Sequence, residues 1–216
     1  MAKERFLIDY EKIRTRKGYH FVKRSLDVIL SAIGLVFLSP LMVIIAYRIK
    51  KEDGGPVIYK QVRVGKNGRH FRMYKFRSMV VNADKLLEKL KKQNEVTGAM
   101  FKMKHDPRVT KTGQFIRKHS LDELPQLVNV LKGDMSLVGP RPPLPSEVAQ
   151  YTNYDRQRLY VVPGCTGLWQ ATERNNVGFN EMVELDLKYI QHASLSYDLW
   201  IIWKTITIIV KPNSSY

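Results

Sequence analysis

The sequence predicts an α/β protein of mostly short helices and one small β-hairpin, monotopic at a membrane through a re-entrant N-terminal helix broken at a proline. The first observation behind this prediction is an uncharged apolar run at 28–47 that contains Ser39 and Pro40. The second is the alternation of apolar and polar residues at 57–76 around an Asn-Gly pair, which is typical of a β-hairpin. The predicted division is a basic segment at 1–24, a membrane helix at 25–50 and a cytoplasmic-face domain at 51–216.

Length and charge restrict the class of partner. The chain of 216 residues is long enough for one folded core, and its formal net charge is +16. Such an excess of positive charge indicates an anionic partner, which could be nucleic acid, an anionic membrane surface or a phosphorylated substrate. The single cysteine, Cys165, excludes an internal disulfide framework and is expected to serve packing. The five histidines are scattered, so no zinc site is expected.

The apolar run at 28–47 is long enough to cross a membrane, since 20 residues at about 1.5 Å each span about 30 Å. Pro40 lies near its middle and lacks the amide hydrogen that a helix needs there. Positive charge marks the cytoplasmic side, and basic residues flank both ends of the run. We therefore expect a helix that enters, bends at Ser39-Pro40 and returns to the same face. The alternatives are a straight crossing and a buried helix in a soluble core. The flanking residues are Lys23 and Arg24 before the run and Arg48, Lys50 and Lys51 after it.

Several segments beyond the membrane helix have recognisable patterns. Residues 199–210 are too short to cross a membrane, but two tryptophans and Lys204 suit an interfacial helix, with a core helix or strand as the alternative. The other predictions are a hairpin of Val57–Val64 and Arg69–Phe76, and helices at Asn82–Asn94, Leu124–Leu131 and Phe179–His192.

The stretch from Ser120 to Gln126 places two carboxylates side by side, Asp122 and Glu123. If Ser120 is an N-cap, Glu123 has the capping-box spacing, whereas Pro125 favours a second phasing in which it begins the helix. In both phasings Asp122 lies near a helix N-terminus, which favours its ionised form by about 0.3–1 kcal/mol. An ionised aspartate can serve as a metal ligand or a nucleophile, and the alternative is an ordinary capped helix start.

Three cations are candidates for binding phosphate. Lys75 and Arg77 follow the second hairpin strand, and arginine can bind phosphate through two hydrogen bonds. Arg141 lies between Pro140 and Pro142, which restrict the backbone around one guanidinium. The alternatives are a solvated basic edge and a proline-rich connector.

Together and in this order, the features resemble the bacterial sugar transferase family, the monotopic phosphoglycosyl transferases of polysaccharide and glycoconjugate assembly. The resemblance extends from about Lys23 to Lys211. Each marker is weak alone, but their joint occurrence behind a basic-flanked apolar run is specific. The markers are Ser39-Pro40, Lys75-Phe76-Arg77, Ser120–Gln126, Gly139-Pro140-Arg141-Pro142 and Pro163–Gln170.

The resemblance implies transfer of a sugar 1-phosphate from a UDP-sugar to polyprenyl (undecaprenyl) phosphate, with release of UMP. It implies Mg²⁺, a covalent aspartyl-phosphosugar intermediate, and a place on the cytoplasmic face of the bacterial inner membrane. The product would initiate exopolysaccharide, capsule or related glycoconjugate synthesis. The implied partners are the UDP-sugar, polyprenyl phosphate and an anionic membrane surface, without nucleic acid; a homodimer stays open.

Site roles follow from the resemblance residue by residue. Asp122 would be the nucleophile, and Glu123 would help hold the metal with it or assist the incoming polyprenyl phosphate. The implied phosphate- and nucleotide-binding residues are Lys75, Arg77, Arg117, Arg141 and Arg174.

The chain departs from the family pattern in two places. Ser78 stands where threonine is usual, and Glu173 replaces a glycine, which affects the expected recognition of sugar or nucleotide. The form of residues 167–170 is similar to that of members that handle plain hexoses.

Two other classes of function fit a basic, membrane-attached chain. One is a nucleic-acid-binding module, for which aromatics interleaved with base-reading cations on one element would be expected; no such element is evident in the sequence. The other is a membrane-anchored, metal-dependent phosphatase, which would release free phosphate without a lipid acceptor.

Overall fold

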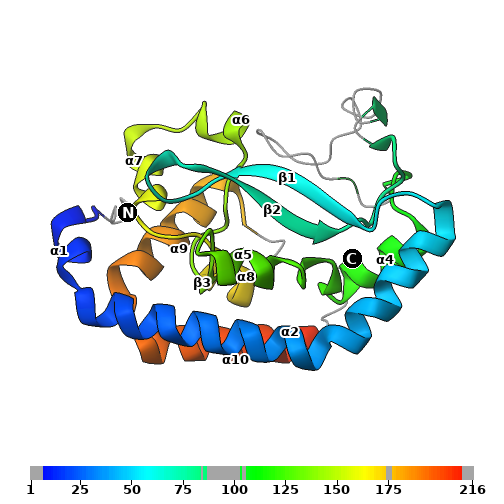
Figure 1. Ribbon diagram of the computed structural model, residues 1–216. Coiled ribbons are helices and arrows are strands. Elements are labelled where there is room, and N and C mark those ends of the chain that lie inside the picture. The colour runs from blue at the N-terminus through cyan, green and yellow to red at the C-terminus, as the bar shows by residue number, and fades with distance from the viewer. Residues whose placement is uncertain (1–6, 84, 87–102, 104–105, 174–176, 211–216) are drawn as a thin grey trace.

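The computed structural model describes residues 7–83, 85, 86, 103, 106–173 and 177–210. Two long helices, α2 and α10, lie side by side at the base, and the shorter elements lie above them (Figure 1). The helices are α1 (Tyr10–Thr15), α2 (Lys17–Asp53), α4 (Lys111–Lys118), α5 (Gln126–Lys132), α6 (Pro145–Val148), α7 (Asn153–Arg156), α8 (Leu168–Thr172), α9 (Phe179–His192) and α10 (Leu195–Val210). The 3-10 helices are η1 (Lys66–Gly68), η3 (Leu121–Glu123) and η4 (Gln157–Tyr160), and the strands are β1 (Ile58–Val64), β2 (His70–Phe76), β3 (Ser136–Val138) and β4 (Gly164–Thr166).

Helix α2 contains the whole predicted membrane segment and extends beyond it at both ends. Its hydrogen-bonded structure continues through Pro40, and its axis changes direction in its second half (Figure 1). Ser39 donates its hydroxyl to the carbonyl oxygen of Val36 at 2.8 Å. The helix is long and apolar enough to cross a membrane, and 11% of its most apolar 18-residue window is buried. Since a core helix would be mostly buried, this exposure favours contact with lipid.

The predicted hairpin is confirmed. Strands β1 and β2 pair antiparallel from Ile58 opposite Phe76 to Val64 opposite His70. The turn between them contains Asn67 and Gly68, both with positive φ angles of 54° and 80°. These are the residues that adopt the left-handed conformation most readily, which explains how the sequence closes the hairpin here.

A second sheet, which the sequence analysis did not predict, joins two of the family markers. Strand β3 pairs parallel with β4, so the residues around Gly139 lie against those around Gly164. A Cβ atom on Gly164 would lie 2.1 Å from the backbone nitrogen of Gly139, which no side chain can tolerate. The two glycines therefore allow the Pro-Arg-Pro loop and the Pro163–Gln170 turn to pack backbone to backbone.

Three of the remaining helices, α5, α9 and α10, match segments that the sequence predicted, whereas α1, α4, α6, α7 and α8 were not predicted. Helix α9 has the predicted bounds, and α5 begins two residues later than predicted and ends at Gly133, which has a φ of 84°. Residues 199–210 are helical, within a helix α10 that begins at Leu195. The helix predicted at Asn82–Asn94 lies largely outside the described residues.

The core lies between the helices and the β3–β4 sheet. One cluster joins α8, α9 and α10 and includes Leu187 and Ile201, both fully buried. A second cluster joins the C-terminal end of α2 to β2 and α4 through Ile45, Phe76 and Ile116. The end of the long helix is therefore packed directly against the elements that lead to the Asp122–Glu123 pair.

Candidate active site

Asp122 and Glu123 lie in the short 3-10 helix η3, between α4 and α5. Ser120 before it has a φ of 54° and a ψ of 22°, and its side chain makes no capping hydrogen bond. The predicted capping box is therefore wrong, because an N-cap side chain needs extended backbone at that residue and Ser120 is left-handed. Pro125 directly precedes α5, which agrees with the second predicted phasing.

Helix α4, which leads to this turn, is fixed at its N-terminal end by two neighbours. A Cβ atom on Gly113 would lie 1.9 Å from the carbonyl oxygen of Ser78, so only glycine permits the close approach to the end of β2. Glu52, in the last turn of α2, accepts a hydrogen bond from the backbone N–H of Lys111 at 2.8 Å. The position of Asp122 is thereby coupled to the C-terminal end of the long helix.

The two carboxylates have different surroundings. Glu123 accepts a hydrogen bond from Lys75 Nζ at 2.6 Å, which confirms that these predicted residues lie together. Burial raises the pKa of Asp122 to about 6, with Glu123 adding to the rise, while Lys75 and Arg117 oppose it. The helix N-terminus does not give Asp122 the low pKa that we expected, because burial of the carboxylate outweighs it. At pH 7 the ionised form of Asp122 still predominates.

Arg141 lies near a buried arginine, Arg63, that the sequence did not indicate and whose pKa the charge of Glu123 also influences. The Nη1 atom of Arg141 lies 3.4 Å from each carboxylate oxygen of Glu147. Arg63 in β1 is 7% exposed and donates from Nη1 to the carbonyl oxygen of Pro142 at 2.9 Å. Burial, followed by the charge of Arg141, lowers the pKa of Arg63 to about 10, and Glu147 and Glu123 act in the opposite direction. Arg63 thus lies between the Glu123 carboxylate and the Pro-Arg-Pro loop.

Comparison with known proteins identifies the family. The model of the family described as bacterial sugar transferase matches residues 18–212. The chain belongs to the bacterial sugar transferase family. This confirms the resemblance predicted from the five markers.

Named relatives of this sugar transferase come from several bacteria. "Galactosyl transferase CpsE" of Streptococcus agalactiae serotype III (strain NEM316) is 45% identical over 218 residues, which cover 94% of this chain and 48% of the relative. "Undecaprenyl-phosphate galactose phosphotransferase" of Salmonella typhimurium (strain LT2) is 42% identical over 99% of this chain and 45% of the relative. "Exopolysaccharide production protein ExoY" of Rhizobium meliloti (strain 1021) is 41% identical over 100% of this chain and 97% of the relative. The chain therefore spans about half the length of the first two relatives and nearly all of the third.

One of the predicted phosphate-binding residues of this sugar transferase, Arg77, does not join the group around Asp122. Arg77 is 7% exposed and forms an ion pair with Asp53 at the end of α2, with its guanidinium packed against Gly55. Phosphate binding by Arg77 stays a prediction, and the contact in this structure is with the long helix. Arg174 lies outside the described residues.

A buried ion pair lies next to the Pro-Arg-Pro loop of the candidate site. Arg158 in η4 lies 2.7 Å from Asp186 in α9, and each side chain is 1% exposed. Arg158 also donates to Tyr151 at 2.6 Å and to the carbonyl oxygen of Arg141 at 3.3 Å. The sequence carried little signal for this network, because Asp186 lies among apolar residues in an otherwise regular amphipathic helix. Its hydrogen bond fixes the backbone at Arg141.

The carboxylate oxygens of Asp122 and Glu123 are suitable ligands for Mg²⁺, but they supply only part of its coordination shell. Magnesium is commonly held by one or two carboxylates, with substrate phosphates and waters completing its shell. Among the described residues, no group of three or more His, Cys, Asp or Glu side chains could hold a metal ion. The pair therefore fits an ion that binds together with a phosphorylated substrate.

Proposed function

We propose that this chain transfers a sugar 1-phosphate from a UDP-sugar to polyprenyl phosphate and releases UMP. The observation that supports this most directly is the arrangement around Asp122: a half-buried carboxylate beside the Glu123–Lys75 ion pair, with Arg117 near enough to lower its pKa. Relatives bear names such as "Undecaprenyl-phosphate galactose phosphotransferase" and "UDP-glucose:undecaprenyl-phosphate glucose-1-phosphate transferase", which agree with this activity.

The reaction is proposed to proceed through a covalent intermediate on Asp122. An Oδ atom of Asp122 attacks the phosphorus next to the sugar, the bond from that phosphorus to the bridging oxygen breaks, and UMP leaves with that oxygen. An oxygen of polyprenyl phosphate then attacks the same phosphorus and displaces the carboxylate. Two displacements at one carboxylate let a soluble donor and a lipid acceptor use the same site in turn.

Each neighbouring residue has a physical role in this scheme. Lys75 and Arg117 stabilise the ionised form of Asp122, which is the nucleophilic form, because both lower its pKa. Arg141 and Arg63 supply positive charge for the diphosphate of the donor, where charge develops as the bond breaks. Asp122 and Glu123 would hold Mg²⁺, which when bound neutralises phosphate charge.

The proposed location is the cytoplasmic face of the bacterial inner membrane, with α2 re-entrant at Ser39-Pro40. The exposed apolar side chains of α2 and the basic residues on both sides of its apolar run support this. In α10, Trp200 and Trp203 are exposed and Lys204 lies over both rings, as expected for a helix at the interface. Contacts of Glu52 and Asp53 with the site elements would then hold Asp122 near the lipid surface.

A plain UDP-hexose is the proposed donor, since the form of residues 167–170 is similar to that of members that handle hexoses. The deciding experiment is a UMP-release assay of the detergent-purified chain with polyprenyl phosphate, Mg²⁺ and a panel of UDP-sugars. We expect UMP release that requires the lipid acceptor for continued turnover and is absent in Asp122→Asn. Intact mass should reveal the phosphosugar adduct on the unmodified chain in the absence of acceptor. An active Asp122→Asn variant, or release of free phosphate without an acceptor, would contradict the proposal.

A further inference from the structure

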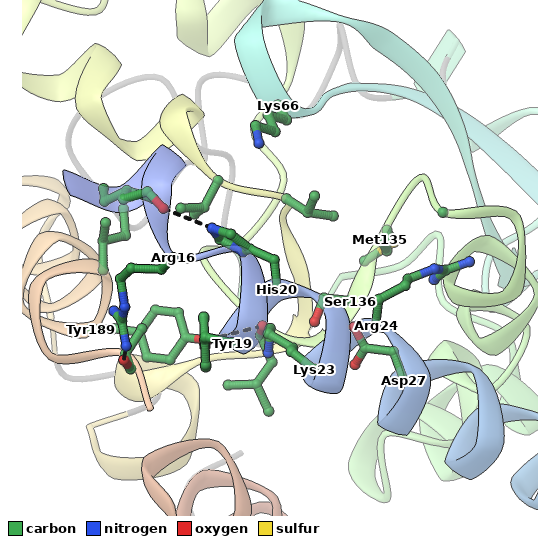
Figure 2. Close-up of a pocket in the computed structure, with 17 residues that line it drawn as sticks. Arg16, Tyr19, His20, Lys23, Arg24, Asp27, Lys66, Met135, Ser136 and Tyr189 are labelled. Carbon is green, nitrogen blue, oxygen red and sulfur yellow. Dashed lines mark hydrogen bonds between the residues drawn. The ribbon is translucent and has the colours of Figure 1, made fainter. Parts of the chain in front are cut away.

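A cavity of about 260 Å³ lies apart from the Asp122 site, between the start of α2, β3 and the C-terminal end of α9 (Figure 2). None of the residues predicted for catalysis or phosphate binding lines it. Its walls are mainly apolar, and its position along α2 is directly before the apolar run that begins at Val28. If α2 enters the membrane as proposed, the cavity lies at the depth of the lipid headgroups. The apolar part of the wall includes Met135, Val138, Val161, Val162 and Ile190.

The cavity is lined by four permanent cations and one carboxylate, Asp27. Arg16 donates to the carbonyl oxygen of Ala193 at 2.6 Å, and Arg24 donates to the carbonyl oxygens that end α5, so neither positive charge is neutralised by these bonds. Lys23 is paired with Asp198 at 2.9 Å. The cavity therefore has an excess of positive charge and favours an anionic occupant.

Lys66 is the cation best placed to respond to such an occupant. It is exposed in the hairpin turn and reaches toward the cavity from the side opposite His20 (Figure 2), and its ammonium group has no hydrogen-bond or ion-pair partner among the described residues. A long lysine side chain without a partner can bind a phosphate as a point charge at little cost to the fold.

A narrower crevice continues from the cavity toward the membrane side. It shares Lys23, Asp27 and Val138 with the cavity and runs between α2 and α10. Asp198, which is paired with Lys23, also lines it, and its other walls are apolar and include Leu26, Leu30, Leu199 and Ile202. A cationic cavity that opens into an apolar crevice between two membrane-facing helices matches a molecule with an anionic head and a hydrocarbon tail.

We propose that this cavity binds the headgroup of an anionic glycerophospholipid, with an acyl chain lying along the exposed apolar side chains of Leu30 and Leu199 that border the crevice. The occupant is the surrounding lipid rather than the acceptor, because the acceptor phosphate must reach Asp122 and no reacting residue lines the cavity. The inference rests on the membrane placement proposed above. Its test reads lipid binding and not turnover, so it can fail while the transferase activity holds.

The test counts lipids retained by the chain. Wild-type protein is reconstituted in phosphatidylcholine nanodiscs that contain phosphatidylglycerol, extracted in mild detergent and examined by native mass spectrometry. We expect one retained phosphatidylglycerol per chain. Lys66→Glu should lower the retained fraction about tenfold, since it reverses a charge close to the headgroup.

The matched control is Arg69→Glu, which makes the same charge change in the same hairpin turn, at an exposed residue that does not line the cavity. Arg69→Glu should retain the lipid as the wild type does. Equal retention in the two variants, or retention of phosphatidylcholine in place of phosphatidylglycerol, would overturn the proposal. So would displacement of the retained lipid by polyprenyl phosphate or by inorganic phosphate at equal concentration.

Discussion

The Nζ atom of Lys75 lies 2.6 Å from Oε1 of Glu123, which joins the end of β2 to the turn that contains Asp122. Both side chains are partly exposed, at 26% and 39%, so the pair adds little to stability. Its effect is on the neighbouring carboxyl group, because Lys75 is the strongest influence that lowers the pKa of Asp122. Ionisation of Asp122, the proposed nucleophile, therefore depends most on a lysine from the hairpin, and Arg117 acts in the same direction.

Replacing Lys75 with methionine should move the pH dependence of the reaction. In the wild type, we expect kcat/KM to rise through about pH 6 as Asp122 loses its proton. Without the lysine the pKa of Asp122 rises further, so the rise in kcat/KM should shift to higher pH, and the rate at pH 7 should fall about twofold for a pKa that is higher by about one unit. The measurement is UMP release between pH 5 and pH 9.

Lys60→Met is the control for that profile, because Lys60 is an exposed lysine on β1 whose neighbour is the Tyr74 ring at 6.0 Å. It should leave the pH at half-maximal kcat/KM unchanged. An unshifted profile in Lys75→Met would show that the lysine does not control the Asp122 proton.

Asp122→Asn should make the protein more stable while it abolishes turnover. The pKa of Asp122 is about 6 in the folded protein against 3.8 ordinarily. Its favourable contribution to the free energy of unfolding is therefore present at low pH and is lost as pH rises through about 6. Asparagine has no such loss. In chelator, the variant should gain roughly 1–2 kcal/mol of unfolding free energy at pH 7 and little at pH 4. Chemical denaturation at the two pH values measures this, and an equal gain at both would contradict the assignment of burial as the cause.

Arg63→Met should weaken binding of the donor. The change removes the hydrogen bond to Pro142 and the buried charge between Glu123 and Arg141. We expect kcat/KM for the UDP-sugar to fall at least tenfold, because an arginine held close to a diphosphate contributes on the order of 1.5–3 kcal/mol. Arg72→Met, at an exposed position of the facing strand, should have little effect. Similar values of kcat/KM for the two variants would exclude Arg63 from the site.

Gly164→Ala should disrupt the contact between the two marker loops. Its Cβ atom would lie 2.1 Å from the backbone nitrogen of Gly139, and a backbone cannot rotate away as a side chain can. We expect a loss of about 1–3 kcal/mol in unfolding free energy, or more. Gly18→Ala, in α2 with nothing within 4 Å of the new Cβ, should be neutral or slightly stabilising. If Gly164→Ala unfolds at the same denaturant concentration as the wild type, the tight β3–β4 packing is refuted.

Local patterns predicted the hairpin and the helices α2, α5, α9 and α10, because their signals lie within one segment, whereas short helices such as α4 and α8 were not predicted. The Asn67-Gly68 turn and the apolar spacing of α9 each determine structure over a few residues. The β3–β4 sheet joins two strands of three residues each, and 25 residues lie between Val138 at the end of β3 and Gly164 at the start of β4. Strands this short show no alternation of apolar and polar residues that could be detected in the sequence.

The candidate site was predicted in part for the same reason. Lys75, Asp122 and Glu123 were found from their motifs, and the structure brings them together. Arg63 was missed because its alternating strand made it look like an exposed residue on the polar face. Arg63 is buried by the Pro-Arg-Pro loop, in which its hydrogen-bond partner Pro142 lies 79 residues further along the chain.

The bend in α2 has a direct test by cysteine labelling. In a Cys165→Ser background, Lys17→Cys and Lys51→Cys place exposed thiols beyond the two ends of the apolar run. A membrane-impermeant maleimide should label neither in intact cells and both in inverted vesicles, because a helix that returns leaves both ends on the cytoplasmic side. Labelling of one position in intact cells would mean a straight crossing.

Phe37→Cys completes that experiment, since Phe37 is 78% exposed in the structure and lies within the apolar run. In water such a side chain would be fully accessible to the reagent, whereas in lipid it is shielded. We expect it to stay unlabelled in both preparations and to react only after detergent is added. Labelling of this thiol in inverted vesicles would place the exposed face of α2 in water and separate the Asp122 site from the lipid surface, because Glu52 and Asp53 attach α4 and β2 to the end of the same helix.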